Sequence, residues 1–313
     1  MFTYFVFRLG SLLVPLLPLR VGYWLASLAG DVAYTLRPQA RTHVVANLRR
    51  ALGDGVAEDR LAVIARSVFR NGAKNYFDLL RLPNLRLSDL EERVQLHGIE
   101  HLKSAVARGN GVILISAHLG SFDTVAQLLA AWGYQVKVPA EVVRPRRLFD
   151  LVTGLRSSHG LHFVPAERGV MRQLIRALQQ GEIVGMAVDR DVQGDGVPLP
   201  FFGAVTTFQP GAVVLARRLG SPVIAAFTLR RENGFFEGHV EPPLEMVVTE
   251  DADHDLVVNL QSILRVMEKY IRAYPEQWVA FEPVWPGEGK LRAGDGAHRE
   301  SCCFAGQSGH PHP

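Results

Sequence analysis

From about residue 94 onward, short apolar runs alternate with amphipathic stretches along the chain. The short runs are typical of strands, and apolar positions at helical spacing are typical of helices. Several runs are apolar at consecutive positions, as expected of strands that helices cover on both faces. The pattern predicts an α/β fold with a central, mostly parallel sheet flanked by helices. The predicted strands are 94–98, 111–116, 135–142, 162–165, 182–189, 222–230 and 235–246, and the predicted helices begin near Ile99, Ser121, Arg146, Val170 and Gln209, with a last helix over 255–274.

The regions on either side of this pattern differ from it. Apolar side chains at helical spacing in 37–93 predict a helical region that packs on the core of an α/β domain over 94–290. Residues 291–313 are rich in Gly, Ser, His and Pro, and they predict a disordered tail.

The segment 1–36 is strongly apolar and carries few charges. Pro15 and Pro18 divide it into two parts, each shorter than the ~20 residues that a helix needs to cross a bilayer. We predict two apolar helices at a membrane interface, with Tyr23 and Trp24 near the lipid headgroups. The alternatives are two helices packed on the protein's own core, or a single tilted span.

Charge and cysteine content narrow the classes of function. The chain has 34 Lys and Arg against 31 Asp and Glu, a formal net charge of +3. This excess does not favour nucleic acid as a partner, since that would require a basic face. Cys302 and Cys303 are adjacent in the tail, so they provide neither a disulfide framework nor a cysteine-based zinc site. The composition favours a cytoplasmic setting.

The stretch ISAHLGSFD, residues 115–123, places polar side chains directly after a predicted buried strand. The ends of such strands are where α/β folds keep their sites. Gly120 permits close backbone approach, Ser121 is a candidate N-cap, and His118 in the turn can meet Asp123 in the first helical turn. A carboxylate on one imidazole nitrogen makes the other a general base. The alternative is a structural histidine that satisfies a helix terminus.

Motifs for other chemistries are missing from the sequence. It has no histidine pair at metal-binding spacing, no G-x-S-x-G turn for a serine nucleophile and no phosphate-binding loop. We therefore expect no metal, and a base without a protein nucleophile. Such a base suits direct attack by the substrate's own hydroxyl group.

Five motifs in register resemble one known family. His118, four residues and then Asp123 are similar to the H-x-x-x-x-D motif of the glycerolipid acyltransferases. The stretches at 140–152, 185–203, 206–227 and 274–285 resemble, in the same order, segments of the bacterial lipid A biosynthesis acyltransferases, a family that includes phosphatidylinositol mannoside acyltransferases. The resemblance covers about residues 1–286.

The resemblance implies an enzyme at the cytoplasmic face of the inner membrane. It would transfer a fatty acyl group to a hydroxyl of a membrane glycolipid or phospholipid, with acyl-CoA or acyl carrier protein as donor and no further cofactor. His118 would be the general base, and Asp123 would orient it. The implied substrate-binding residues are Glu141, Arg144, Asp189, Arg190 and Asp191, with backbone near Gly203 as an oxyanion donor. Phe201 and Phe202 either line the acyl slot or belong to the core. Glu276 and Gln277 are expected to anchor the last helix.

One departure leaves the acceptor open. The lipid A enzymes commonly have Asn-Trp-Glu where this chain has Ser121-Phe122-Asp123, and the block beginning at Asp189 looks closer to the mannoside enzymes. A lipid A precursor and a phosphatidylinositol mannoside both remain candidates. Rival functions on the same fold are a non-catalytic lipid-binding protein and a thioesterase-like hydrolase.

Overall fold

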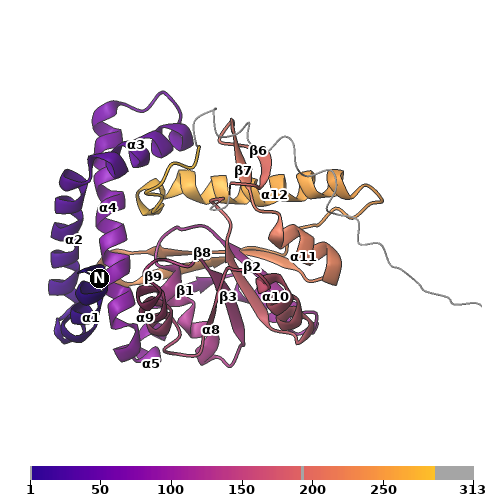
Figure 1. The fold of residues 1–313 in the computed structure, drawn as a ribbon, viewed down its shortest axis with the longest axis horizontal. Coiled ribbons are helices and arrows are strands. Elements are labelled where there is room, and N and C mark those ends of the chain that lie inside the picture. Colours follow the sequence, from indigo (N-terminus) through magenta and orange to yellow (C-terminus); the bar gives the residue numbers. More distant parts are fainter. Residues whose placement is uncertain (1, 192–193, 286–313) are drawn as a thin grey trace, which may run out of the picture.

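A computed structural model describes residues 2–191 and 194–285. Its α/β part is a seven-stranded sheet in the order β1-β9-β8-β2-β5-β3-β4 (Figure 1). The five strands from β8 to β4 run parallel, while β9 pairs antiparallel with β8 and parallel with β1. The predicted α/β class with a mostly parallel sheet is confirmed. The strands are β1 (Val94–His97), β2 (Val112–Ser116), β3 (Val136–Ala140), β4 (His162–Pro165), β5 (Ile183–Ala187), β8 (Val223–Arg230) and β9 (Phe236–Val240).

Two findings correct the predicted strands. β9 ends at Val240 rather than at residue 246, because Pro242 and Pro243 have no N–H to donate to a ladder. A separate antiparallel hairpin, β6 (Val197–Phe201) and β7 (Ala204–Phe208), lies where no strand was predicted. Prolines within β6 argue against a strand in a large sheet, but a two-stranded ribbon accepts them.

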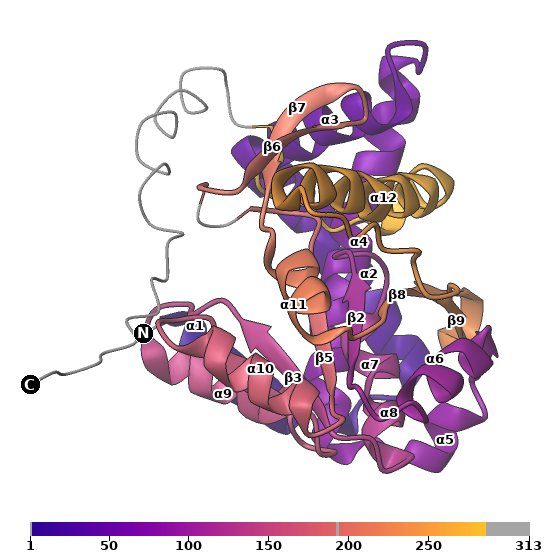
Figure 2. The same ribbon diagram turned by 90° about the vertical axis from the view of Figure 1, so that its right-hand side faces the viewer.

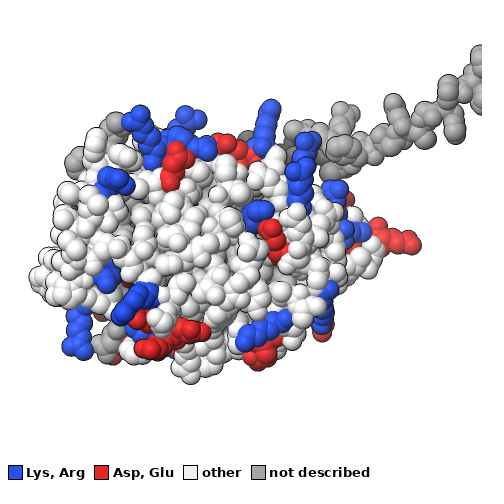
Figure 3. Space-filling model, turned by 90° about the horizontal axis from the view of Figure 1, so that it is seen from below, with Lys and Arg blue, Asp and Glu red and all other residues white. Residues whose placement is uncertain are grey.

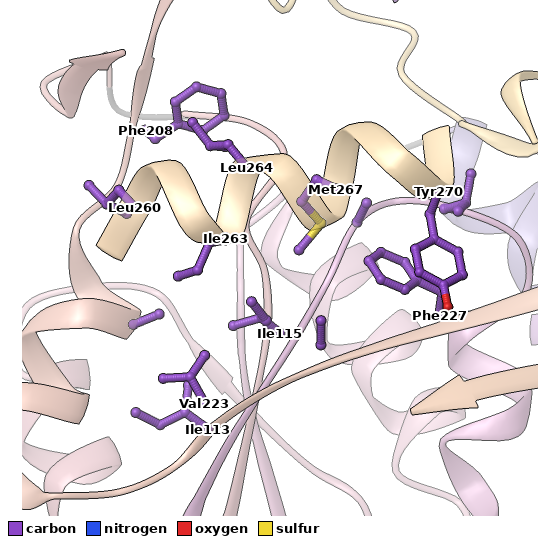
Figure 4. Packing of buried hydrophobic residues seen from close by; sticks show 14 of the residues in the cluster. Ile113, Ile115, Phe208, Val223, Phe227, Leu260, Ile263, Leu264, Met267 and Tyr270 are labelled. Atoms are coloured by element: carbon purple, nitrogen blue, oxygen red, sulfur yellow. The ribbon is translucent and has the colours of Figure 1, made fainter. Parts of the chain in front are cut away.

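Helices cover both faces of the sheet (Figures 1 and 2). Along β2, Ile113 and Ile115 pack in the cluster formed with α10, α11 and α12, whereas Val112 packs with α6 and α8 on the other face. Figure 4 shows the first cluster, in which apolar side chains of α12 lie over β2 and β8. These helices are α6 (Ile99–Val106), α8 (Gln127–Ala131), α10 (Val170–Gln179), α11 (Gly211–Leu219) and α12 (Ala252–Ala273).

The remaining helices are mostly N-terminal. Figure 1 shows α1, α2 and α4 together at one side of the sheet, with α3 at the upper end of α2. The longer members are α1 (Phe2–Leu13), α2 (Leu19–Leu36), α3 (Pro38–Leu52), α4 (Glu58–Arg81) and α9 (Arg146–Arg156), and the short ones are η1 (Val14–Leu16), η2 (Leu82–Asn84), α5 (Leu87–Glu91), α7 (Phe122–Val125), η3 (Glu232–Gly234) and η4 (Pro275–Gln277).

Small residues bring α2 against α4. Gly22, Ala26 and Gly30 recur every four positions on one face of α2 and are buried. A Cβ on Gly30 would lie 2.6 Å from the Cα of Arg70, so only glycine permits this approach. The inner face of α2 is thus fixed on the protein, while its outer face is exposed.

Across the described residues, no helix combines the length and apolar character needed to cross a bilayer. The predicted tail, 291–313, lies outside the described residues.

Candidate active site

The imidazole of His118 is paired with the carboxylate of Asp189. Nδ1 of His118 lies 2.7 Å from Oδ1 of Asp189. The sheet explains this contact, since β2 and β5 are adjacent and parallel with Ser116 opposite Ala187. Two residues beyond each of these positions come His118 and Asp189. The carboxyl ends of two neighbouring strands therefore bring the pair together.

The carboxylate of Asp189 is completely buried. The indole Nε1–H of Trp278 donates to its second oxygen at 3.0 Å. Burial alone would raise the pKa of Asp189, but the charge and hydrogen bond of His118 and the hydrogen bond of Trp278 outweigh it, and they lower the pKa from 3.8 to about 2. Asp189 is therefore an ionised acceptor at neutral pH.

This pairing sets the chemistry of the His118 ring. Because an ionised carboxylate only accepts, the proton on the neutral imidazole resides on Nδ1, and Nε2 carries the free lone pair. Nε2 has no hydrogen-bond partner in the part of the chain that the structure describes, and 32% of the side chain is exposed. The arrangement is that of a general base open to a substrate.

The predicted contact between His118 and Asp123 is wrong. The Asp123 carboxylate accepts hydrogen bonds from Arg156 on α9, at 3.0 Å from Nε and 2.9 Å from Nη2. Asp123 lies in α7, with its carboxylate toward α9, whereas His118 lies in the turn that precedes α7. Asp123 thus joins α7 to α9, and the carboxylate that contacts the His118 imidazole is that of Asp189.

Backbone contacts on both sides hold the turn that carries His118. The carbonyl of His118 accepts from Val279 N at 2.8 Å, and Gly120 N donates to the carbonyl of Gln277 at 3.0 Å. Gly120 has φ +65°, and a Cβ there would lie 1.6 Å from the carbonyl oxygen of Thr228. The expected close approach at Gly120 is confirmed, and its partner is β8.

A buried polar network lies under the same turn. Arg230 Nη1 contacts Asp78 Oδ2 at 2.7 Å, and both side chains are over nine-tenths buried. Ser121 occupies the predicted N-cap position of α7, but its side chain does not cap the helix. Its Oγ donates instead to the same Asp78 oxygen. Asn75 bridges the Gly120 carbonyl and Arg230 Nη2, each at 2.7 Å.

The network reaches α2 through a tyrosine. The hydroxyl of Tyr23 donates to Asp78 Oδ1 at 2.9 Å and accepts from Arg230 Nη1 at 2.8 Å. Burial, together with the charge of Asp78, raises the pKa of Tyr23, so that the phenol stays protonated. Tyr23 thus faces the protein, which corrects the prediction that its ring lies among lipid headgroups.

Two of the predicted substrate-binding residues pair with each other beside the base. Arg190 follows β5 and Glu141 follows β3, and Arg190 Nη2 lies 3.1 Å from Glu141 Oε2. Arg190 Nε is buried and has no partner within the described residues. Arg144 is exposed, in the loop before α9. Binding of substrate by these three residues stays a prediction.

Asp191 has a structural task in this structure. Its carboxylate accepts from the backbone N–H of Gly194 and of Gly196, each at 2.9 Å, and from Gln209 at 2.8 Å. Burial would raise the pKa of Asp191, but these hydrogen bonds outweigh it and lower the pKa. Gly203 lies at the exposed β6–β7 turn, and its role as an oxyanion donor stays a prediction.

The aromatic and C-terminal candidates belong to the core. Phe201 is fully buried and Phe202 nearly so, and both pack near Trp278 and Trp285. Gln277 exchanges two hydrogen bonds with the backbone of Arg230. It therefore anchors η4 to β8, whereas Glu276 contributes its carbonyl to Asn71.

Comparison with known protein families places this chain in one of them. The model of the bacterial lipid A biosynthesis acyltransferase family matches residues 1–286, so the chain belongs to this family and is an acyltransferase.

Characterised relatives are similar over about three quarters of their length. A phosphatidylinositol mannoside acyltransferase of Mycobacterium tuberculosis is 25% identical over 76% of this chain and 75% of its own. One of Mycolicibacterium smegmatis is 26% identical over 76% and 77%. A lipid A biosynthesis acyltransferase of Haemophilus influenzae is 23% identical over 83% and 77%.

Asp189 and Asp123 should differ in their effect on kcat and on its pH dependence. We expect Asp189→Asn and His118→Ala each to lower kcat by about 10²–10⁴, because both variants remove the oriented base. The double variant should be no slower than His118→Ala, since the two groups act as one unit. Asp123→Asn should lower the urea midpoint of unfolding and leave the pH dependence of kcat unchanged. A pH profile altered by Asp123→Asn but not by Asp189→Asn would reverse the assignment.

Removing the charge of Asp78 from the buried network should lower the free energy of unfolding. Asp78→Asn leaves the Arg230 guanidinium buried without its ion pair, and we expect a loss of about 3–5 kcal/mol in the free energy of unfolding. Arg66→Gln is the control, since Arg66 also forms an ion pair from α4, with Asp31 of α2, but its side chain is exposed. Urea unfolding should show a much smaller change for this variant. Equal losses would mean that Asp78 and Arg230 form no more than a surface pair.

Proposed function

We propose that this protein transfers a fatty acyl group from a thioester donor to a hydroxyl group of a membrane glycolipid or phospholipid. The observation that carries the proposal is the half-exposed His118, with Nδ1 on the buried Asp189 and Nε2 free. Nε2 takes the proton of the acceptor hydroxyl as its oxygen attacks the thioester carbonyl carbon. When the C–S bond breaks, the thiolate leaves and receives the proton from His118.

The donor is acyl-CoA or acyl carrier protein. A general base makes the acceptor alcohol a better nucleophile toward the thioester carbonyl, because it removes the hydroxyl proton as the oxygen attacks. Arg190 supports a charged substrate, since it directly follows Asp189 and its buried Nε has no partner among the described residues. A guanidinium binds phosphate well, so we assign Arg190, with Glu141 and Arg144, to the polar part of donor or acceptor.

The acceptor carries sugar hydroxyls, of the mannoside or lipid A type. Support comes from the mycobacterial relatives, which are phosphatidylinositol mannoside acyltransferases, and from the Haemophilus relative, a lipid A biosynthesis acyltransferase. Both lipids reside in membranes, so the enzyme has to reach a bilayer surface, which we place on the cytoplasmic side of the inner membrane.

The outer faces of α1, η1 and α2 are suited to that surface. Twelve exposed large apolar side chains lie within residues 5–36, against eight in the rest of the described chain. Figure 3 views the molecule from below and shows few charges over the N-terminal helices, with Lys and Arg along the edges. A concentration of exposed apolar side chains on one part of a protein is typical of a protein or membrane interaction site. The membrane face consists of Phe5, Val6, Leu9, Leu12, Leu13, Leu16, Val21, Trp24, Leu25, Leu28, Val32 and Leu36.

The transfer can be tested with purified protein, an acyl-CoA of defined chain length and total bacterial membrane lipids. We expect loss of thioester together with an acylated lipid, seen by mass spectrometry, and loss of both with His118→Ala. Free fatty acid without an acylated lipid would identify a hydrolase instead. Lipid binding without thioester consumption would identify a non-catalytic lipid-binding protein.

Docking can be tested separately on neutral phosphatidylcholine vesicles. Leu16 is 78% exposed on the membrane face. Leu16→Asp should lower the partition coefficient about tenfold or more, because it puts a charge in place of a leucine that docking would bury in the bilayer. Val248, 64% exposed elsewhere, provides the control Val248→Asp, which should bind vesicles like the wild type. Equal effects of the two variants, or no binding by the wild type, would rule out docking through this face.

A further inference from the structure

Trp278 contacts both members of the His118–Asp189 pair. Its indole Nε1–H donates to Oδ2 of Asp189 at 3.0 Å, while Oδ1 of the same carboxylate faces Nδ1 of His118. The backbone at Trp278 is also joined to the turn of His118, since Leu119 and Trp278 form an isolated antiparallel bridge and Val279 N donates to the His118 carbonyl at 2.8 Å. The segment that carries the indole is therefore fixed to the segment that carries the imidazole.

The indole donates to a carboxylate that has no contact with solvent. Asp189 has no exposed surface, and only 1% of Trp278 is exposed. Hydrogen bonds to a carboxylate lie close to its plane, so a donor on each oxygen keeps the Asp189 carboxylate from rotating. The orientation of this plane sets the orientation of the imidazole that donates to it.

Aromatic packing keeps the indole of Trp278 in place. The rings of Phe201 and Phe202 lie against it, with centroids 6.5 and 6.3 Å from the indole. Phe201 also stacks on a second indole, that of Trp285, whose Nε1–H donates to the carbonyl of Ala204 at 3.1 Å. Because an indole has a single N–H, Trp285 has none left for Asp189. The two tryptophans share a cluster and differ in what they bind.

Charged groups on the neighbouring elements bind one another rather than Asp189. They are the pairs Arg190–Glu141 after β5 and β3, Arg156–Asp123 between α9 and α7, Arg230–Asp78 between β8 and α4 and Arg272–Glu268 on α12, together with Asp191, which binds Gly194, Gly196 and Gln209. The hydrogen bond from Trp278 is therefore the contact that adjusts how strongly the Asp189 carboxylate attracts the imidazole.

We propose that Trp278 is a positioning residue for acyl transfer, which acts on the base through Asp189. The proposal rests on the proposed function, in which Nε2 of His118 takes the proton of the acceptor hydroxyl. The indole N–H makes the carboxylate a weaker acceptor toward His118, so that the imidazole remains neutral, as a base must be, down to lower pH. The same hydrogen bond holds the ring in one orientation.

Trp278→Phe tests this role because it removes the N–H and keeps an aromatic ring. The carboxylate should then hold the protonated imidazole more strongly, and the acid limb of the pH profile of kcat/KM should move to higher pH by roughly half a pH unit or more. At pH 7 we expect kcat to fall about tenfold, with KM nearly unchanged, because no substrate contact is lost. Trp278→3-benzothienylalanine, with sulfur in place of N–H, keeps the bicyclic shape and should give the same shift if the smaller ring impairs folding.

Trp285→Phe is the matched control. It removes an indole N–H from the same aromatic cluster without touching Asp189. We expect a lower urea midpoint of unfolding for this variant, and the acid limb of kcat/KM at the same pH as in the wild type. An unmoved acid limb in Trp278→Phe, or an equal movement in both variants, would overturn the proposal and leave Trp278 a purely structural residue.

A titration without substrate separates this inference from the transfer activity. The imidazole signals of His118 are assigned by NMR as those missing from His118→Ala. Their titration midpoint should lie at higher pH in Trp278→Phe than in the wild type and in Trp285→Phe. This result in a protein that transfers no acyl group would overturn the proposed function while the action of Trp278 on the imidazole stands. Acyl transfer with an unchanged midpoint would overturn the role of Trp278 instead.

Discussion

The active site depends on one buried charge. The Asp189 carboxylate has no contact with water, so it is stable as an anion only while the His118 and Trp278 N–H groups donate to it. These donors come from segments that are distant in sequence, one after β2 and one after η4. Because an unpaired buried charge is costly, the sheet and the C-terminal segment must both be in place for the Asp189 carboxylate to be stable. The same contacts fix the tautomer of the His118 imidazole.

A second buried charge acts on the other side of the same turn. Arg230, the last residue of β8, is paired with Asp78 of α4. Asp78 also accepts a hydrogen bond from Ser121, and Arg230 reaches the carbonyl of Gly120 through Asn75. The turn that carries His118 thus lies between the His118–Asp189 hydrogen bond and the Arg230–Asp78 ion pair, and displacing either would leave a buried charge without its partner. A mobile base would lose much of its advantage, because general-base catalysis needs the nitrogen within hydrogen-bonding reach of the hydroxyl.

Sequence patterns were sufficient for the sheet but only partly for the site. Apolar runs predicted all seven strands of the sheet, because burial on both faces leaves a local signal. The partner of His118 was misassigned, since Asp123 is close in sequence whereas Asp189 is close only once β5 is known to lie beside β2. The offset of two residues beyond Ser116 and Ala187 would have identified it, but strand order is a non-local property. Trp278 lies within the motif at 274–285, but nothing in that stretch points to Asp189, and Arg156 and Asp78 belong to no motif.

The helix α2 joins the proposed docking surface to the chemistry. Its outer face carries Trp24 and Leu28, and its inner face carries Tyr23, which reaches Asp78 and through it the turn of His118. At Gly22 and Gly30, α2 lies in direct contact with α4. A shift of α2 would therefore disturb the buried ion pair, which Tyr23 of α2 contacts. In the proposed function, the depth at which α2 lies in the bilayer therefore sets the height of the base above it. An acceptor whose hydroxyl lies at that height in the headgroup layer is reached without leaving the membrane, which makes the distance from acyl chain to hydroxyl a determinant of acceptor choice.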